Sequence, residues 1–240
     1  MNRRWVIVPA AGVGRRMGSE RPKQYLELAG MPVLSHVLQR FAGLSQLAAI
    51  VVALNPEDHY WNSIAKPSHA RLQTVAGGAE RRHSVWNALG ALDGEAHDRD
   101  WVLVHDAARP CVRIADVLRL LGDIERHPAG GLLALPLTDT VKRGDSAMQA
   151  EATVDRSGLW RAQTPQVFRY GALKAALGQA LAGNRAVTDE SQAMELAGHR
   201  PLLVAGSADN IKITDMQDMK LAELYLQLQA AERKPERERA

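Results

Sequence analysis

The stretch WVIVPAAGVGRRM, residues 5–17, joins an apolar run to a loop of small and basic residues. The run from Trp5 to Val8 is typical of a strand that is covered on both faces. The small residues from Ala10 to Gly14 would let backbone N–H groups approach phosphate oxygens, because little or no side chain stands in the way. Arg15 and Arg16 follow directly, and Lys23 comes a few residues later. The stretch therefore predicts a first strand followed by a cationic phosphate-binding loop.

Further apolar runs of strand length alternate with segments of helical spacing along the rest of the chain. The runs lie at residues 49–54, 72–75, 101–104, 132–135 and 202–204, and the helical segments at residues 32–42, 82–92, 114–126 and 170–182. Another helix is expected to end at Leu196, with Thr188 or Asp189 as its N-cap. This alternation predicts an α/β fold with a doubly wound, mostly parallel, Rossmann-like sheet. In such a sheet, ligands bind beyond the carboxyl ends of the strands.

The composition is that of a globular protein, since 46% of the 240 residues are hydrophobic and 24% are charged. A chain of this length can form one core, so we expect a single domain over residues 1–240. The 30 basic and 27 acidic residues leave a net charge of only +3, which argues against a nucleic-acid-binding surface. The single cysteine, Cys111, excludes an internal disulfide, and the first apolar run is too short for a signal peptide or a membrane span. We therefore expect a cytoplasmic protein that does not bind membranes.

Residues 137–161 interrupt the alternation of strands and helices. Two short β-prone pieces, residues 138–143 and 153–160, flank a polar Gly-Asp-Ser turn at residues 144–146. This pattern is typical of a hairpin arm that projects from the sheet. Its exposed Val, Leu and Trp side chains would be covered in a homodimer, and a surface excursion that folds back on its own chain fits the pattern equally well. Residues from about 230 to 240 carry mixed charge and are expected to form a frayed, solvated tail.

The phosphate-binding loop differs from the loops of other nucleotide-binding proteins. Its Gly12-Val13-Gly14 begins like a dinucleotide-binding fingerprint, but Met17 stands where that fingerprint needs a third glycine. The second strand ends at Asn55, without the acidic residue that would hold a ribose. These two positions disfavour a dinucleotide-dependent oxidoreductase. Fixed cations instead favour transfer at phosphorus, where they stabilise the transferred group and the departing pyrophosphate.

Other polar motifs are ambiguous when each is taken alone. Asp106 follows a central strand, where it would coordinate Mg²⁺, hold a substrate hydroxyl or form a turn or helix cap. Its neighbour His105 is expected to be a buried, hydrogen-bonded histidine rather than a base. The glycines of residues 77–84 would let backbone groups contact a nucleotide base, with Ser84 in the first helical turn, or they form an ordinary strand–helix turn. Thr164 and Thr188 could form a helix cap or a turn as readily as line a binding site. Lys212 could equally be an ordinary solvated surface lysine.

Taken together and in order, these motifs resemble those of the 2-C-methyl-D-erythritol 4-phosphate cytidylyltransferase family. The resemblance extends from Trp5 to about Tyr225 and includes residues 10–17, 22–25, 105–110, 154–156, 188–190 and 209–212. It implies a sheet of the nucleotidyltransferase type and transfer of CMP from CTP to methylerythritol phosphate, with release of pyrophosphate. The product, 4-diphosphocytidyl-2-C-methyl-D-erythritol, belongs to the non-mevalonate route to isoprenoids. The resemblance also implies a Mg²⁺ cofactor and a homodimer in which the arm crosses to the other subunit.

The resemblance assigns roles to individual residues. The implied catalytic residues are Arg16 and Lys23, which would stabilise the pentavalent transition state, with Lys212 and with Arg156 acting in the neighbouring subunit. The residues implied to surround CTP are Ala10, Ala11, Gly12, Gly14, Gly78, Ser84 and Ala107. The residues implied to line the sugar-phosphate pocket are Asp106, Arg109, Thr140, Thr164, Thr188 and Lys212. The candidate metal ligands are Asp106 and Asp209.

One position departs from the family pattern, and two further functions fit parts of the sequence. The family commonly has Gly-Gly-Asp in the base-reading turn, whereas this chain has Ala79 as the third residue. If the backbone makes that contact, nothing is lost; if the carboxylate makes it, cytosine selectivity is in question. A ribitol 5-phosphate cytidylyltransferase would share the loop and the chemistry. A non-catalytic nucleotide sensor would keep the glycines but would not need Arg16, Lys23 and Lys212 together.

Overall fold

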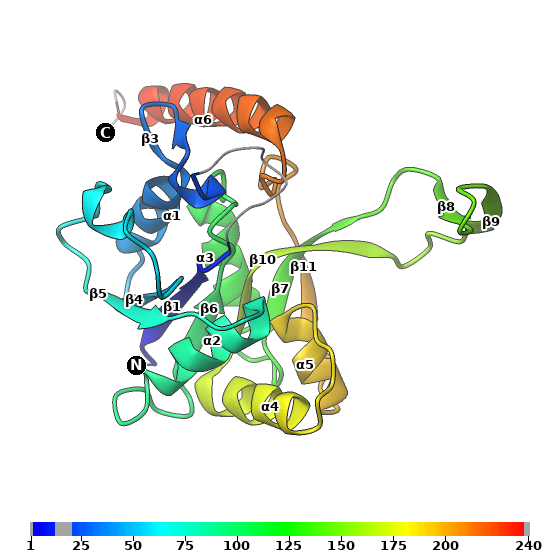
Figure 1. Cartoon of the computed structure of the whole chain (residues 1–240), viewed down its shortest axis with the longest axis horizontal. Coiled ribbons are helices and arrows are strands. Elements are labelled where there is room, and N and C mark those ends of the chain that lie inside the picture. Colours follow the sequence, from blue (N-terminus) through cyan, green and yellow to red (C-terminus); the bar gives the residue numbers. More distant parts are fainter. Residues whose placement is uncertain (1, 13–20, 238–240) are drawn as a thin grey trace.

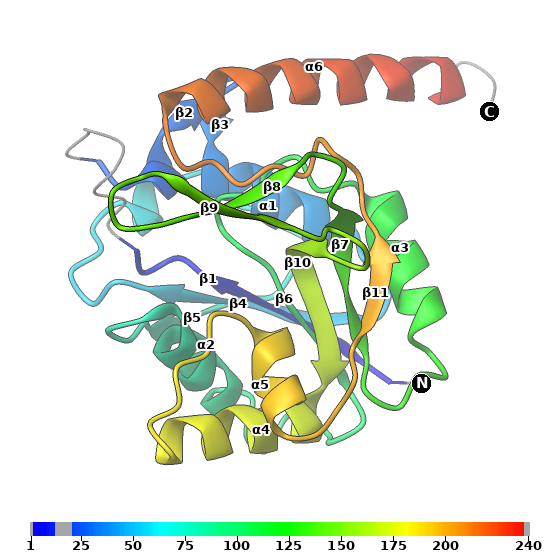
Figure 2. The same ribbon diagram turned by 90° about the vertical axis from the view of Figure 1, so that its right-hand side faces the viewer.

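A central seven-stranded sheet forms the core of the computed structural model, which describes residues 2–12 and 21–237 (Figures 1 and 2). The strand order is β11-β7-β10-β6-β1-β4-β5. The bounds are β1 Arg4–Pro9, β4 Leu47–Leu54, β5 Leu72–Ala76, β6 Trp101–Val104, β7 Gly131–Pro136, β10 Trp160–Arg169 and β11 Leu202–Ala205. Strand β10 runs antiparallel to both of its neighbours, and the other paired strands are parallel. The prediction of a mostly parallel sheet is therefore confirmed.

Helices cover both faces of this sheet, which explains why its strands are apolar throughout (Figure 2). In β1, Val6 and Val8 pack into the core on one face, and Trp5 and Ile7 pack into the core on the other. The first face is covered by α1 (Val33–Ala42) and α3 (Ile114–Asp123). The second face is covered by α2 (Arg81–Gly90), α4 (Tyr170–Ala182) and α5 (Glu190–Leu196). The alternating helices predicted from the sequence thus form the two outer layers.

Strand β10 was not predicted, because its sequence does not have the pattern of a central strand. Gln163, Thr164 and Gln166 are polar, and Pro165 lacks the N–H that a sheet ladder uses. In the structure the register of β10 against β7 shifts between Ala162 and Gln166, so the proline lies in an irregularity of the ladder. The polar side chains are buried and hydrogen-bonded, as shown by Thr164 Oγ1 lying 3.0 Å from His105 Nδ1.

A long helix, α6 (Met216–Arg237), lies outside the main layers and packs on the short strands β2 (Glu27–Leu28) and β3 (Met31–Pro32) (Figure 1). The predicted frayed tail from residue 230 is wrong as far as Arg237. Gln229 anchors the helix by donating from Nε2 to the Cys111 carbonyl oxygen at 2.8 Å, and Glu232 pairs with Arg113 at 2.6 Å. No helix within residues 2–12 and 21–237 is long and apolar enough to cross a membrane.

A two-stranded hairpin projects from the body between β7 and β10 (Figure 1). Its strands are β8 (Val141–Gly144) and β9 (Ala150–Val154), and they pair with each other rather than with the main sheet. The predicted arm at residues 137–161 is therefore present, but its second limb is shorter than expected. Trp160 and Arg161 already belong to β10 and pair with Pro136 and Leu135 of β7.

Candidate active site

A pocket opens at the carboxyl ends of β1, β5 and β6, on the edge of the sheet where the sequence predicted ligands. It is lined by residues 9–12 after β1, Lys23 and Gln24, residues 78–81 and Ser84 after β5, residues 106–108 after β6, and Lys212. Lys23 and Gln24 belong to the short 3-10 helix Lys23–Tyr25 (η2). The pocket thus collects residues from five segments of the chain.

Gln24 fixes the described part of the phosphate-binding loop. Its side-chain amide donates to the carbonyl oxygens of Ala10 at 2.7 Å and Gly12 at 3.0 Å. The side chain is almost fully buried, so these bonds replace water contacts that the carbonyl groups would otherwise need. Because each carbonyl points to Gln24, the Ala10–Gly12 backbone is held in one orientation beside the pocket.

The turn between β5 and α2 is closed by Ser84. Its hydroxyl accepts from the Gly78 backbone N–H at 3.0 Å and donates to the Glu80 carbonyl oxygen at 3.3 Å. Gly77 is required here, because a Cβ atom at that position would lie 2.3 Å from the Cβ of Ala11. The hydroxyl of Ser84 is therefore occupied within the turn, although the residue lines the pocket.

Three cationic side chains converge on Asp106. Its Oδ1 lies 3.0 Å from Arg81 Nε, and its Oδ2 lies 3.0 Å from Lys212 Nζ and 3.5 Å from Arg109 Nε. The Asp106 backbone N–H also donates to Thr164 Oγ1 at 3.0 Å. Burial raises the pKa of Asp106, but the charges of Arg81, Lys212 and Arg109 outweigh burial and hold that pKa well below its ordinary value. The carboxylate is therefore ionised at neutral pH.

Arg81 connects this carboxylate to a second one. Its Nη1 and Nη2 donate to Glu190 Oε1 at 2.7 Å and Oε2 at 3.0 Å. Burial lowers the pKa of Arg81, but the neighbouring Glu190 and Asp106 carboxylates raise it overall. This geometry is the two-bond pairing that the planar guanidinium favours.

His105 is fully buried, and it does not have the properties of a base. Its Nε2 lies 3.0 Å from the Arg109 carbonyl oxygen, and its Nδ1 lies 3.0 Å from Thr164 Oγ1. Burial lowers its pKa to about 4. Both ring nitrogens are thus occupied, and the prediction of a buried, hydrogen-bonded histidine is confirmed.

The segment that carries Lys212 is tied to the rest of the site by backbone and side-chain contacts. Arg109 Nη1 donates to the Asn210 carbonyl oxygen at 2.7 Å, and Asn210 Nδ2 donates to the Thr164 carbonyl oxygen at 2.8 Å. Lys23 Nζ donates to the Ile213 carbonyl oxygen at 2.9 Å. These contacts bring Lys23 and Lys212 to the same pocket although they are far apart in sequence.

Most of the predicted site residues are assembled in this way. The predicted residues that line the pocket are Ala10, Ala11, Gly12, Lys23, Gly78, Ser84, Asp106, Ala107 and Lys212, and Arg109 and Thr164 contact Asp106. Gly14 and Arg16 lie outside the described residues. Thr188 lies next to α5, where its backbone N–H and hydroxyl contact Gln192 Oε1, and Asp189 is the N-cap that accepts from Gln192.

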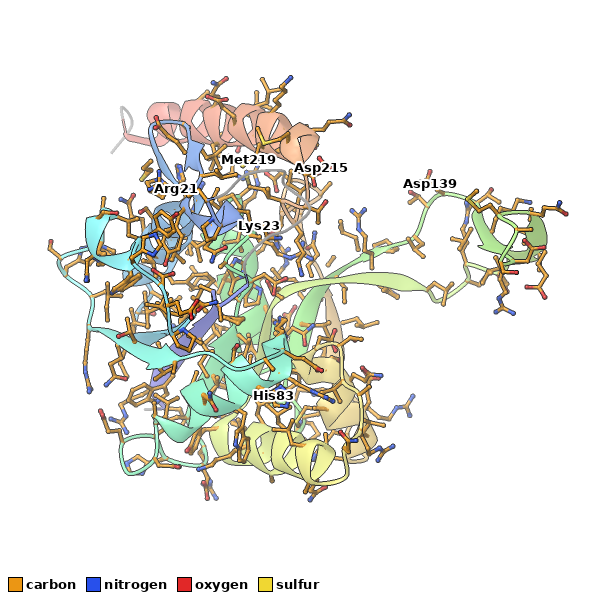
Figure 3. All side chains as sticks on the ribbon, viewed as in Figure 1. Arg21, Lys23, His83, Asp139, Asp215 and Met219 are labelled. Atoms are coloured by element: carbon orange, nitrogen blue, oxygen red, sulfur yellow. The ribbon has the colours of Figure 1, made fainter. Side chains whose placement is uncertain are left out.

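Two predicted residues lie on the arm, away from the pocket of their own chain. Thr140 and Arg156 are exposed there, and Arg156 donates to the Thr138 carbonyl oxygen. Figure 3 labels Asp139, the neighbour of Thr140, far out on the arm and Lys23 in the body. One chain alone therefore does not bring these two residues to Lys212.

Asp209, the other candidate metal ligand, does not line the pocket. Its Oδ2 accepts from Arg113 Nε at 2.7 Å and from Gln229 Nε2 at 2.8 Å. These partners come from the start of α3 and from α6, so the carboxylate stabilises the packing of α6. The partners are 96 and 20 residues away, so no local pattern indicates these contacts.

The donor set fits a metal ion that the substrate phosphates help to hold. Among residues 2–12 and 21–237, no group of three or more His, Cys, Asp or Glu side chains could form a metal cage. Two carboxylates, Glu80 and Asp106, line the pocket, and Glu80 pairs with Arg82. Mg²⁺ is commonly bound by one or two carboxylates together with phosphate oxygens and water, so Asp106 suits it as a protein ligand.

Gln24, Arg81 and Glu190 make contacts that the sequence did not predict. Gln24 and Glu190 lie inside motifs that were recognised, but no role was assigned to either. Arg81 gave no local signal, because its partners lie 25 and 109 residues further along the chain. Only the sheet topology brings these three elements together.

Comparison with known proteins identifies the family of this chain. The profile of the 2-C-methyl-D-erythritol 4-phosphate cytidylyltransferase family matches residues 5–228. Proteins of that name from Hahella chejuensis and from a Pseudomonas putida strain are each 50% identical, over 92% and 90% of this chain and 92% of their own. The crystal structure of the Francisella tularensis protein of that name has a TM-score of 0.82 at 36% identity, covering 93% of this chain and 100% of its own. The chain belongs to the 2-C-methyl-D-erythritol 4-phosphate cytidylyltransferase family.

Proposed function

We propose that this chain transfers CMP from CTP to 2-C-methyl-D-erythritol 4-phosphate at the pocket described above. Pyrophosphate is released, and 4-diphosphocytidyl-2-C-methyl-D-erythritol is the product. Family membership supports the reaction. The observation that supports this location is the convergence of Lys23, Lys212 and the Asp106 cluster beside a loop of small residues.

The nucleotide occupies the side of the pocket formed by the Ala10–Gly12 backbone, Lys23 and the Gly78–Ser84 turn. Backbone N–H groups and Lys23 bind the phosphates, because N–H dipoles and the ammonium charge both stabilise the negative charge on the phosphate oxygens. The Gly78 carbonyl group and the Ala79 backbone contact the base, because the Gly78 N–H and the Ser84 hydroxyl are already bonded to each other within the turn. On this reading, alanine at position 79 does not reduce cytosine selectivity.

The acceptor occupies the other side, near Asp106, Arg109, Thr164 and Lys212, with Thr188 at its edge. Its phosphate oxygen attacks the α-phosphorus of CTP, forming one P–O bond while the bond to the β-phosphate oxygen breaks. A phosphate monoester is already anionic near neutral pH, so the attack needs no general base. Lys23 and Arg16 stabilise the charge that develops on the transferred and leaving groups.

Mg²⁺ is proposed as the cofactor, with Asp106 as its protein ligand. When bound, the ion would neutralise charge on the triphosphate. Arg81, Arg109 and Lys212 meanwhile keep the Asp106 carboxylate ionised and in place. Asp209 takes no part, since Arg113 and Gln229 hold it elsewhere.

The arm is proposed to complete the site of a second copy in a homodimer. Thr140 and Arg156 carry the family's acceptor-binding residue types, yet both lie on the arm and away from their own pocket. The arm also exposes Met148 and Leu159, and Trp160 at the start of β10 is exposed beside them; a second subunit would cover these side chains. An arm that packs on the second subunit would explain both the distance of Thr140 and Arg156 from their own pocket and the exposed apolar side chains.

A panel of substrates tests the proposed reaction. Pyrophosphate release is measured with four nucleoside triphosphates, each combined with methylerythritol phosphate, ribitol 5-phosphate and a hexose 1-phosphate. Release with CTP and methylerythritol phosphate alone is expected. Release with ribitol 5-phosphate instead would identify the sister activity, and broad release or none would contradict the proposal.

A further inference from the structure

Arg81 lies between two buried carboxylates that come from different elements. It is the first residue of α2, Asp106 follows β6, and Glu190 is the first residue of α5. Its Nε contacts Asp106, and both of its terminal nitrogens contact Glu190. The Glu190 side chain is 2% exposed and the Asp106 side chain 10%. The guanidinium therefore joins three elements at the wall of the pocket.

Stability alone does not account for this arrangement. Buried ion pairs recover little more than the cost of removing their charges from water, and apolar side chains of similar shape often serve as well. Arg81 lines the pocket, and its partner Asp106 also contacts Lys212 and Arg109. The three cations and two carboxylates of this cluster leave one unit of positive charge beside the pocket. This net positive charge favours the binding of an anionic acceptor.

We propose that Glu190 and Arg81 form a positioning pair that fixes the Asp106 carboxylate and sets the charge of the acceptor side. The proposal rests on the proposed function, and neither residue is assigned a contact with the reacting atoms. Glu190 occupies both terminal nitrogens of Arg81, so that Arg81 presents only Nε to Asp106. Asp106 then keeps its Oδ2 for Lys212 and Arg109.

Loss of the Glu190 charge would change both the position of the Asp106 carboxylate and the net charge of the acceptor side. The terminal nitrogens of Arg81 would be free to turn toward Asp106 or toward a phosphate, which would draw Asp106 away from Lys212. The cluster would also gain a second unit of positive charge, so an anionic acceptor would bind more tightly. Slower turnover together with tighter acceptor binding is the signature of this pair, because a general loss of structure would weaken binding.

Two variants and a matched control test the proposal in the full-length enzyme. Glu190→Gln keeps the size of the side chain and removes its charge. Arg81→Lys keeps the charge and removes the two-bond fork. The control is Glu95→Gln, because Glu95 forms the same two-bond pair with Arg71 on the surface, away from the pocket. Initial rates give kcat and the KM for methylerythritol phosphate, and thermal unfolding of each variant is measured beside them.

Glu190→Gln is expected to lower kcat about tenfold and to lower the KM for methylerythritol phosphate about threefold. Arg81→Lys is expected to lower kcat about tenfold with that KM changed by less than about twofold, and Glu95→Gln to match the parent enzyme.

A kcat for Glu190→Gln within about twofold of the parent, or a raised acceptor KM, would overturn the positioning pair. If Glu190→Gln does not fold, the same criterion applies to Arg81→Lys: a kcat within about twofold of the parent would overturn the positioning pair. Failure of the parent enzyme to turn over CTP and methylerythritol phosphate would instead overturn the proposed function.

Discussion

Gln24 provides a direct test of how the phosphate-binding loop is held. Gln24→Met keeps the length of the side chain and removes both hydrogen bonds to the loop, at 2.7 Å and 3.0 Å. A neutral hydrogen bond contributes about 1 kcal/mol net, so the free energy of unfolding should fall by about 2 kcal/mol. If the same free energy is needed to order the loop around CTP, the KM for CTP rises by at most about 30-fold. The kcat should change less, since the cations remain.

The stability change is measurable by urea unfolding followed through tryptophan fluorescence, since Trp5 and Trp101 are buried in the core. Steady-state rates at saturating methylerythritol phosphate give the KM for CTP. Gln73→Met is the control, because the Gln73 amide makes only a 3.4 Å contact with Glu95; its unfolding free energy should change by less than about 0.5 kcal/mol. An unchanged KM for CTP in Gln24→Met would refute the claim that this amide orders the loop.

Further predictions concern Lys23, Asp209 and the pH dependence of stability. Lys23→Ala should mainly lower kcat, because its contact strengthens in the transition state, and near-parental turnover would contradict that role. Asp209→Asn should lower the free energy of unfolding by roughly 1–3 kcal/mol and leave the Mg²⁺ concentration for half-maximal activity unchanged; a raised Mg²⁺ requirement would restore Asp209 as a ligand. Burial lowers the pKa of His105 to about 4, so the unfolded chain binds the extra proton first. The contribution of His105 to the free energy of unfolding should be fully present above about pH 6.5 and should fall as the pH drops toward 4. His105→Gln should flatten this decline in urea unfolding, leaving the part due to His36, whose pKa burial also lowers; an unchanged decline would contradict the assignment.

The sequence predicted the elements whose burial follows a simple pattern. The apolar runs at β1, β4, β5, β6, β7 and β11 all form strands, because a sheet covered on both faces selects such runs. Strand β10 was missed because its buried Gln163, Thr164 and Gln166 are satisfied by partners far away in the chain. No local pattern carries that information.

In the candidate site too, residues with a local sequence signal were predicted, and residues whose partners are distant in the chain were missed. Residues that act through backbone or small size, such as Gly77 and Ala11, could be found from composition and position after a strand. Arg81 and Glu190 could not, since a buried ion pair between α2 and α5 depends on how the helices pack on the sheet. Asp209 lies close to Lys212 in sequence, but its Oδ2 accepts from Arg113 and Gln229, and no local pattern indicates those contacts.

Subunit mixing tests most directly the central claim that one site is built from the body of one chain and the arm of another. Arg156→Ala and Lys212→Ala should each be nearly inactive alone. In a mixed dimer, both lesions fall in one site and the other site is intact. Equal amounts, after verified subunit exchange, should therefore recover about a quarter of parental activity, since half of the dimers carry one good site of two. Absence of recovery would contradict the exchanged arm.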